Sequence, residues 1–294
     1  MPFLLAHLSD PHIGPLPKPR ARDLMGKRLT GWLNWRRRRG IHDMDMLARV
    51  VADMRAHNPD HVAMTGDILN IGLPAEFSAA RAWLETLGSE ANVSFVPGNH
   101  DAYVPSALPR ILETFAPWCA SDGATRASFP WLRVRGEVAL IGVSSAIATA
   151  PFLASGRVGA EQRETPEIML RQTGERGLAR VVLIHHPPWE GGASFGRGLR
   201  DARHLGQTIA RAGAELVLHG HNHRLVRHIL PGDGRMVPSI GVASASAVPG
   251  TPRHRAAWHL HAIERGESGW TITTRVRGVL PDTGEIGDIE TFEA

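Results

Sequence analysis

Five short polar clusters along this chain combine histidine, aspartate and asparagine, side chains that often bind metal ions in enzymes. In chain order their members are Asp10 and His12 (LSDPH), Asp67 (TGD), Asn99 and His100 (GNHD), His185 (LIHHP), and His221 and His223 (HGHNH). Each cluster stands where a strand is expected to end, which is where α/β proteins place their sites. The set contains no thiolate and suits Mn, Fe, Zn or Co. Together the clusters predict a site for two metal ions and the chemistry of a hydrolase.

The first two clusters offer carboxylate and imidazole ligands. Asp10 and His12 are two residues apart, so strand geometry that continued beyond Ser9 would project both side chains to the same side. Asp67 follows Gly66, and glycine lets the backbone turn sharply toward a ligand. A carboxylate has two oxygens, so Asp67 could bridge two ions about 3.5–4 Å apart.

The third cluster, GNHD, places three different functional groups in a row. Asn99 offers a neutral carbonyl oxygen as a ligand. His100 points elsewhere and is free to face a substrate. The carboxylate of Asp101 could orient either His100 or a loop amide, as carboxylates behind metal ligands commonly do.

The last two clusters supply further imidazoles. One histidine of the pair His185 and His186 should be a ligand, and the other should pack or form a hydrogen bond. His221 and His223 share the spacing of two residues seen in the first cluster. His219 has that spacing too, but it precedes a glycine within a strand, so a structural role is expected for it.

The remaining sequence alternates between strand and helix patterns. Apolar runs predict strands at residues 3–9, 61–65, 93–96, 181–184 and 216–218, and helical periodicity marks residues 42–58, 74–88 and 200–212. Two strands around Gly136 predict a hairpin, and Ala257–Ile263 with Trp270–Val276 predict an antiparallel hairpin near the C-terminus. Such a pattern indicates an α/β protein with mixed sheets covered by helices.

Bulk composition favours one globular domain over residues 1–294, with a C-terminal hairpin and tail at 253–294. The first residues lack the features of a signal peptide, and no apolar run approaches the roughly 20 residues that span a bilayer. A single cysteine, Cys119, excludes an intrachain disulfide framework and points to the cytoplasm. The formal charge of +4 suits anionic substrates.

Residues 24–40 form a basic insert that contains two tryptophans. Within it, Lys27–Arg39 reads KRLTGWLNWRRRR, in which an apolar stripe of Leu29, Trp32, Leu33 and Trp35 is followed by clustered arginines. Three interpretations stay open: a surface helix that docks its tryptophans, a contact with anionic membrane lipid at the inner membrane face, and, least favoured, nucleic-acid binding. A homo-oligomer is also compatible with the sequence, with the tail hairpin or the loop Gly191–Gly198 as contact or cap regions.

The series DPH, GD, GNHD, HHPP and GHNH resembles the calcineurin-like metallophosphoesterase superfamily, in family order over residues 3 to about 225. The opening HLSDPHIG, the form HHPP and the tail hairpin are similar to the bacterial cyclic-nucleotide phosphodiesterase branch. The resemblance implies a four-layer α/β/β/α sandwich of two mixed sheets flanked by helices. It also implies two divalent or trivalent ions, one on Asp10, His12, Asp67 and His223, and the other on Asp67, Asn99, His185 and His221.

The expected activity is that of a metal-dependent phosphodiesterase acting on cyclic nucleotides or other small phosphodiesters. Two cations lower the pKa of a shared water, so that a hydroxide between them can attack phosphorus. His100 would stabilise the phosphoryl group and assist the leaving alkoxide, with Asp67 as the bridge. The alternatives are a phosphoesterase for phospholipid or nucleotide-lipid head groups at the membrane surface, and an inactive binding scaffold.

Overall fold

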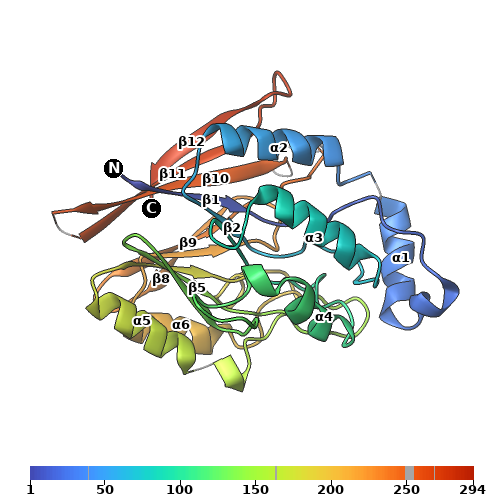
Figure 1. The fold of residues 1–294 in the computed structure, drawn as a ribbon, viewed down its shortest axis with the longest axis horizontal. Coiled ribbons are helices and arrows are strands. Elements are labelled where there is room, and N and C mark those ends of the chain that lie inside the picture. Colours follow the sequence, from blue (N-terminus) through green and yellow to red (C-terminus); the bar gives the residue numbers. More distant parts are fainter. Residues whose placement is uncertain (39, 163, 249–254, 268) are drawn as a thin grey trace.

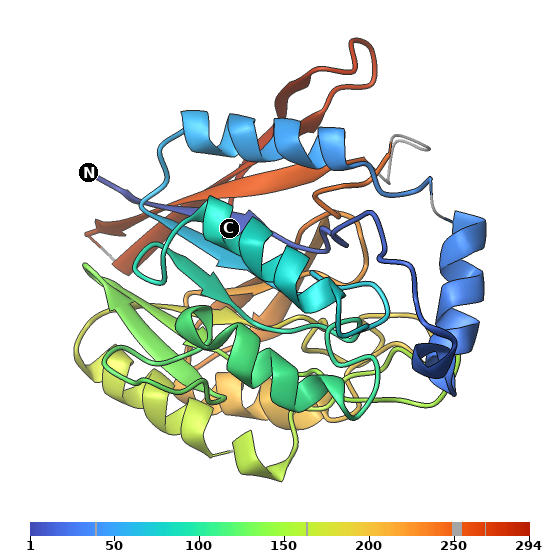
Figure 2. The ribbon, with the colours of Figure 1, turned by 45° about the vertical axis from the view of Figure 1, so that its right-hand side comes forward.

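Two six-stranded sheets pack face to face, and helices cover the outer face of each (Figures 1 and 2). This computed structural model describes residues 1–294 except 39, 163, 249–254 and 268. The predicted four-layer α/β/β/α sandwich of mixed sheets is therefore confirmed.

The first sheet joins the two ends of the chain. Its strand order is β12 (Ile286–Glu293), β11 (Gly269–Val279), β10 (Ala257–Gly266), β1 (Phe3–Leu8), β2 (His61–Met64) and β3 (Val93–Phe95). β1 pairs in parallel with β2 and antiparallel with β10. The predicted C-terminal hairpin is present as β10 and β11, and it forms part of the first sheet rather than an addition to it.

The second sheet carries the remaining strands. Its order is β4 (Trp131–Arg135), β5 (Val138–Gly142), β6 (Ala179–Leu183), β7 (Leu216–His219), β9 (Met236–Gly241) and β8 (Val226–Pro231). The hairpin predicted around Gly136 is confirmed as β4 and β5. The sequence reading did not assign β8, β9 or β12.

Helices from alternating segments cover the sheets. On the first sheet lie α2 (Met44–Ala56) and α3 (Glu76–Leu87), with α4 (Ala107–Thr114) beside α3, and on the second lie α5 (Thr165–Glu175) and α6 (Ala202–Ala212). Three short 3-10 turns, Ala21–Leu24, Ala116–Trp118 and Ala160–Gln162, complete the elements of the described residues. None of the helices in those ranges has both the length and the apolarity needed to cross a membrane.

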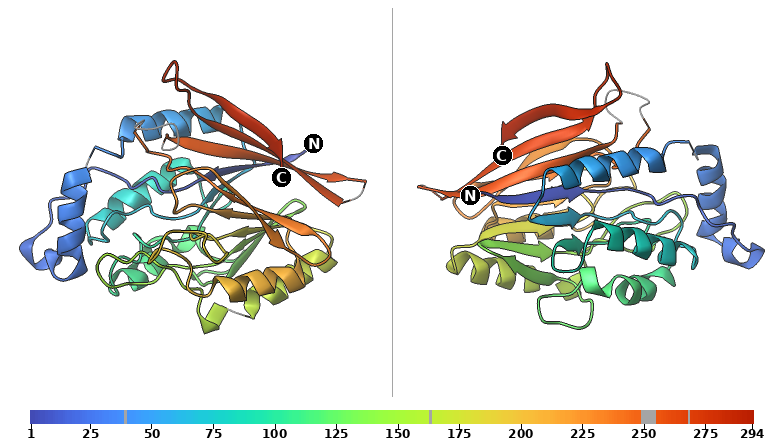
Figure 3. Two further views of the ribbon diagram at one scale, coloured as in Figure 1. Left: turned by 180° about the vertical axis from the view of Figure 1, so that it is seen from behind. Right: turned by 45° about the horizontal axis from the view of Figure 1, so that its top comes forward.

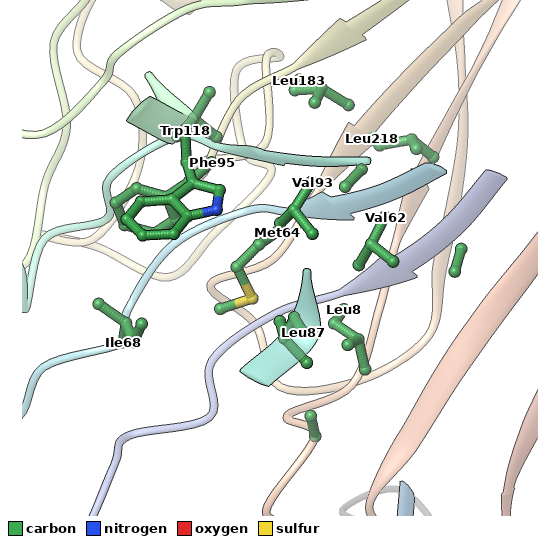
Figure 4. Close-up of a cluster of buried hydrophobic side chains, with 14 of the residues drawn as sticks. Leu8, Val62, Met64, Ile68, Leu87, Val93, Phe95, Trp118, Leu183 and Leu218 are labelled. Carbon is green, nitrogen blue, oxygen red and sulfur yellow. The ribbon is translucent and has the colours of Figure 1, made fainter. Parts of the chain in front are cut away.

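The largest apolar cluster draws on both sheets. Figure 4 shows Met64 and Val93 of the first sheet in one cluster with Leu183 and Leu218 of the second. These strands are buried on both faces, as expected of parallel strands covered on each side. The cluster also holds Cys119, so this free cysteine packs in the core.

The basic insert forms helix α1 (Lys27–Arg38), which lies at the edge of the sandwich apart from both sheets (Figure 3). Trp32 and Trp35 are partly buried against a small cluster of Leu16, Ile71 and Leu73. Leu29 and Leu33, which belong to the same apolar stripe, stay 44% and 45% exposed. The helix turns its two tryptophans inward, and Gly31 between the stripe residues is buried. Arg39 lies outside the described residues.

One ion pair ties a covering helix to the C-terminal strands. Asp53 of α2 accepts two hydrogen bonds from Arg277 of β11, at 2.8 and 2.7 Å, and a third from the indole of Trp258 on β10. The two charged side chains are only 16% and 11% exposed. Removal of the carboxylate would leave three N–H donors, two of Arg277 and one of Trp258, short of a partner in a place where water replaces it poorly.

We expect Asp53→Ala to lower the free energy of unfolding by about 2–3 kcal/mol, because the buried bidentate pair and the indole bond are lost together. Urea denaturation measures the loss. Glu285→Ala is the matched control. It removes an exposed ion pair between Glu285 and Arg49, which lies on the same helix α2, and should cost less than about 1 kcal/mol. Equal losses for the two variants would contradict this account.

Candidate dinuclear metal site

The five polar clusters converge where β1, β2, β3, β6 and β7 end, so loops from both sheets meet at one place. All seven predicted ligands and His100 lie there, buried or partly buried. The distances between their donor atoms divide the predicted ligands into two groups.

The first group consists of Asp10, His12 and His223. The Nε2 atoms of His12 and His223 are 3.4 Å apart, and Nε2 of His223 is 3.1 Å from Oδ1 of Asp10. The Nδ1 atom of His12 donates to the carbonyl of Leu69 at 3.1 Å, which fixes the ring and leaves Nε2 with its lone pair. Two ring nitrogens and a carboxylate oxygen therefore face a common point.

The second group consists of Asp67, Asn99, His185 and His221. Oδ1 of Asn99 lies 3.2 Å from Nε2 of His185 and 2.9 Å from Nδ1 of His221, and these two nitrogens are 3.3 Å apart. Oδ2 of Asp67 is 3.3 Å from the same His185 nitrogen. His185 uses its Nδ1 for the carbonyl of Thr65, at 2.7 Å, so Nε2 is the atom presented to the group.

The donor atoms are spaced as ligands of a metal ion would be. Two nitrogens bound tetrahedrally at about 2.0–2.1 Å from one zinc ion stand about 3.4 Å apart. The His12–His223 and His185–His221 nitrogen pairs have separations of 3.4 and 3.3 Å. One oxygen each of Asp10 and Asp67 also lies within 4.8 Å of the other, which places two buried carboxylates side by side. Cations would relieve that repulsion, so the residues fit a pair of metal ions.

The pKa values of Asp67 and His185 show that the site favours the charged forms of both side chains. Burial alone would raise the pKa of Asp67, yet the neighbouring His185 and His100 hold it well below its usual range. Burial would likewise lower the pKa of His185, but the Asp67 carboxylate raises it to about 9. The protein thus stabilises a carboxylate in a fully buried position.

Left-handed backbone turns aim these side chains. Of the seven non-glycine residues with positive φ in the described ranges, five are predicted ligands: Asp10, His12, Asp67, His221 and His223. Such conformations are strained for L residues and concentrate at functional sites. The expectation that strand geometry continues past Ser9 is therefore wrong, because β1 ends at Leu8 and the following loop turns instead.

Gly66 allows the close approach that the sequence predicted for it. Its φ is +99°, and a Cβ atom there would lie 2.6 Å from both the amide nitrogen of Gly98 and Nδ1 of His185. A side chain at this position would push apart the loops that carry Asp67 and Asn99.

Asp101 holds the loops through their amides. It accepts hydrogen bonds from the backbone nitrogens of Asp67, Leu69 and Gly98 at 2.8, 2.9 and 2.7 Å. Burial and the nearby Asp67 raise its pKa to about 7. Of the two roles expected for Asp101, the structure shows the contact with loop amides.

His100 faces the open side of the site. Its Nδ1 donates to the carbonyl of Asn70, and its ring meets that of His12 edge-on at 4.7 Å. Burial lowers the pKa of His100. With Nδ1 engaged, Nε2 is the atom left for a substrate.

The two remaining histidines of the motifs are occupied elsewhere. His186 contacts the Ser145 hydroxyl with Nδ1 at 2.8 Å and the Ala154 carbonyl with Nε2 at 3.0 Å. His219 is fully buried and meets the Trp189 ring at 5.3 Å. His186 thus forms hydrogen bonds, and His219 is a buried residue at the end of β7.

A cavity of about 540 Å³ opens above the site. It reaches His12, Asp67 and His100, and its walls include residues that sequence reasoning missed: Asn34, Arg38, His42, Tyr103, Arg197, Asn222 and Arg224. His42 packs on His12 with ring centroids 4.4 Å apart. Asn222 belongs to the HGHNH cluster but was given no role there, and the others were not expected at the site, because only the tertiary fold brings α1 and the 191–197 loop to the cavity.

The sequence is similar to those of named phosphoesterases. A model of calcineurin-like phosphoesterases matches residues 3–225. A probable cyclic nucleotide phosphodiesterase of Synechococcus sp. is 25% identical over 246 residues, which cover 81% of this chain and 87% of that protein. The glycerophosphodiester phosphodiesterase GpdQ of Enterobacter lignolyticus is 27% identical over 226 residues, or 76% and 72% of the two chains.

Solved structures show the same fold. A dimetal phosphatase from Danio rerio superposes with a TM-score of 0.62 at 14% identity, over 100% of this chain and 99% of that one. The purple acid phosphatase PPD1 from yellow lupin seeds superposes with a TM-score of 0.58 at 13% identity, over 99% of this chain and 53% of that one. Because the family model spans most of the chain, including all five clusters, the chain belongs to the calcineurin-like phosphoesterase family.

Proposed function

We propose that this protein is a phosphodiesterase whose two metal ions are held by the seven clustered side chains. One ion is assigned to Asp10, His12, Asp67 and His223, and the other to Asp67, Asn99, His185 and His221. The single observation that carries the proposal is the spacing of the imidazole nitrogens, 3.3 and 3.4 Å, in two groups that meet at Asp67. The family implies a pair of divalent ions, and the donor set accepts Mn, Fe, Zn or Co.

Two bound cations would supply a water of lowered pKa and stabilise charge on the phosphoryl oxygens. The chain positions the remaining groups. The backbone amide of His100 donates to Oδ1 of Asp67 at 2.7 Å, which fixes the carboxylate relative to the His100 ring. From its place in the cavity wall, Nε2 of His100 is the group assigned to proton transfer with the leaving oxygen.

Cyclic nucleotides and other small phosphodiesters are the proposed substrates. The cavity volume of about 540 Å³ suits a ligand of that size. Arg38, Arg197 and Arg224 give its walls positive charge, and Trp35 and Tyr103 offer aromatic surfaces for a base. The names of the two curated relatives, both phosphodiesterases, support a diester over a monoester.

We also propose that residues 1–294 act as one domain. β10 of the C-terminal segment pairs along β1, the strand that leads directly to Asp10 and His12. Without the C-terminal strands, β1 would become an edge strand with unpaired backbone groups.

A second candidate function is hydrolysis of a lipid head group at a membrane surface. α1 contributes Gly31, Asn34, Trp35 and Arg38 to the cavity, so a surface bound by α1 would lie beside the site. Leu29 and Leu33 are exposed on that helix next to exposed arginines, which is the composition of an interfacial helix.

Chelation should abolish hydrolysis of bis(p-nitrophenyl) phosphate, and Mn²⁺ should restore it. The value of kcat/KM for this diester should exceed that for p-nitrophenyl phosphate by about tenfold or more, which corresponds to about 1.4 kcal/mol. A panel of cyclic nucleotides, glycerophosphodiesters and phospholipids then ranks the substrates. No turnover of any ester after reconstitution would support the inactive scaffold instead.

His100→Ala should lower kcat by about 10²–10⁴-fold while both metal ions remain bound, because the ring acts on the substrate and not as a ligand. Elemental analysis of the purified variant measures metal content beside kinetics. Asp67→Asn is the matched control and should lose metal. Loss of both ions from His100→Ala would show that His100 is a ligand.

If α1 binds lipid, the protein should sediment with anionic vesicles at low salt and not with neutral ones. Double substitution of Arg36 and Arg37 by glutamine should weaken binding, and raised salt should do the same. Arg203→Gln, an exposed arginine on α6, is the control. Absence of sedimentation with anionic vesicles at low salt eliminates the membrane function.

A further inference from the structure

Three histidines gather on one face of the first sheet, away from the polar clusters. In β10, His259 and His261 are two residues apart and so project to the same side. His7 of β1 pairs directly with His259 in the antiparallel register, which places it beside both rings. Ring centroids are 6.0 Å apart for His7–His259 and His7–His261, and 5.8 Å for His259–His261.

This face of the sheet looks toward the second sheet. His7 shares its side of β1 with Leu5, which pairs with His61 of β2. The ring of His61 contacts the Ser94 hydroxyl at 2.8 Å, and the same hydroxyl accepts from Arg133 of β4 in the second sheet. The three histidines therefore lie in the layer between the sheets, where each is completely buried.

The rings are held, yet they have polar atoms without partners. One nitrogen of His7 contacts the Thr65 hydroxyl at 2.8 Å, and one nitrogen of His261 contacts the Thr274 hydroxyl at 2.9 Å. Nδ1 of His7, Nε2 of His261 and both nitrogens of His259 form no hydrogen bond. A buried polar atom without a partner costs about 1–3 kcal/mol, so four of them in one cluster call for a ligand.

The geometry suits a metal ion. One nitrogen from each ring lies within 4.8 Å of one nitrogen from each of the other two. That limit is about 1.4 Å wider than the spacing of about 3.4 Å around tetrahedral zinc, so a bound ion would draw the three rings closer together. The threonine hydroxyls act as the hydrogen-bond partners that commonly orient metal-binding histidines. Burial lowers the pKa of all three rings, to about 3 for His261, so they are neutral and their lone pairs are available.

A second cavity lies beside the cluster. It has a volume of about 500 Å³, and its lining includes Val226 of β8, Ala257 and His259 of β10, and Val276 of β11. His259 is the member of the cluster that forms part of its wall. A bound ion would leave a fourth position for a water or a small anion.

We propose that His7, His259 and His261 form a third metal site, which binds one transition-metal ion that prefers imidazole, with Zn²⁺ as the representative. Three neutral imidazoles without carboxylate favour Zn, Cu or Ni over Mn or Mg. The site shares no residue with the two groups around Asp67. It joins β1 to β10 across the first sheet and so fastens the C-terminal strands to the N-terminal one.

The test counts metal ions in the full chain. Protein stripped with a chelator is loaded with Zn²⁺, desalted and analysed for zinc per chain. Wild type should bind three ions, whereas His259→Phe and His261→Leu should each bind two. His204→Ala, which removes an exposed histidine, is the matched control and should bind three.

Measurements of ester hydrolysis distinguish this site from the catalytic one. His259→Phe should keep hydrolysis of bis(p-nitrophenyl) phosphate after loading with Mn²⁺, and Zn²⁺ should no longer raise its melting temperature as far as that of wild type. If the protein proves inactive on every ester, the zinc count still decides this proposal, because it does not depend on turnover.

If the variants fail to fold, a measurement on the wild-type protein tests the proposal instead. Crystals loaded with Zn²⁺ should give an anomalous peak at the zinc edge between the three rings. A peak there supports the site. A water molecule or nothing at that position overturns it, as does a wild-type zinc count of two that His259→Phe leaves unchanged.

Discussion

The site depends on one buried carboxylate, that of Asp67, which the protein must keep charged without exposure to water. Its Oδ1 accepts the amide of His100, its Oδ2 stands 3.3 Å from His185, and its own amide donates to Asp101. These contacts link loops that follow β2, β3 and β6, so they join the two sheets at their strand ends. The left-handed turn at Asp67 and the close approach at Gly66 serve this constraint, because they bring the loop after β2 against the loops after β3 and β6.

Much of the fold could be predicted because its central strands are buried on both faces. Segments such as residues 61–64 and 179–183 can be predicted as buried strands without knowledge of the strands that lie beside them in the sheet. β8 and β12 escaped prediction because they lie at sheet edges, where exposed charged residues alternate with partly buried ones and the apolar signal is weak. Sheet order could not be inferred either, since nothing local indicates that the C-terminal strands pair with β1.

The same distinction between local and tertiary features applies to the candidate site. Ligand types and their order were visible because each cluster is a short continuous segment. The backbone geometry of Asp10 and His12 was not, because a left-handed turn leaves no mark on residue spacing. His42 escaped notice because no motif includes it. Arg38 was recognised as part of the basic insert but not of the site, because α1 reaches the cavity only through tertiary packing of Trp32 and Trp35. The three histidines between the sheets come from opposite ends of the chain, so only strand register brings them together.

The pairing of β1 with β10 has a consequence for how the protein is made. β1 leaves the ribosome well before β10, its antiparallel partner, because the two strands lie far apart in the sequence. The strand that leads to Asp10 and His12 must therefore wait, with one edge unpaired, until the segment that carries β10 has been synthesised. Contacts between such distant segments slow folding and expose intermediates to aggregation. The sheet beneath the first polar cluster is thus completed only after β10 has been synthesised.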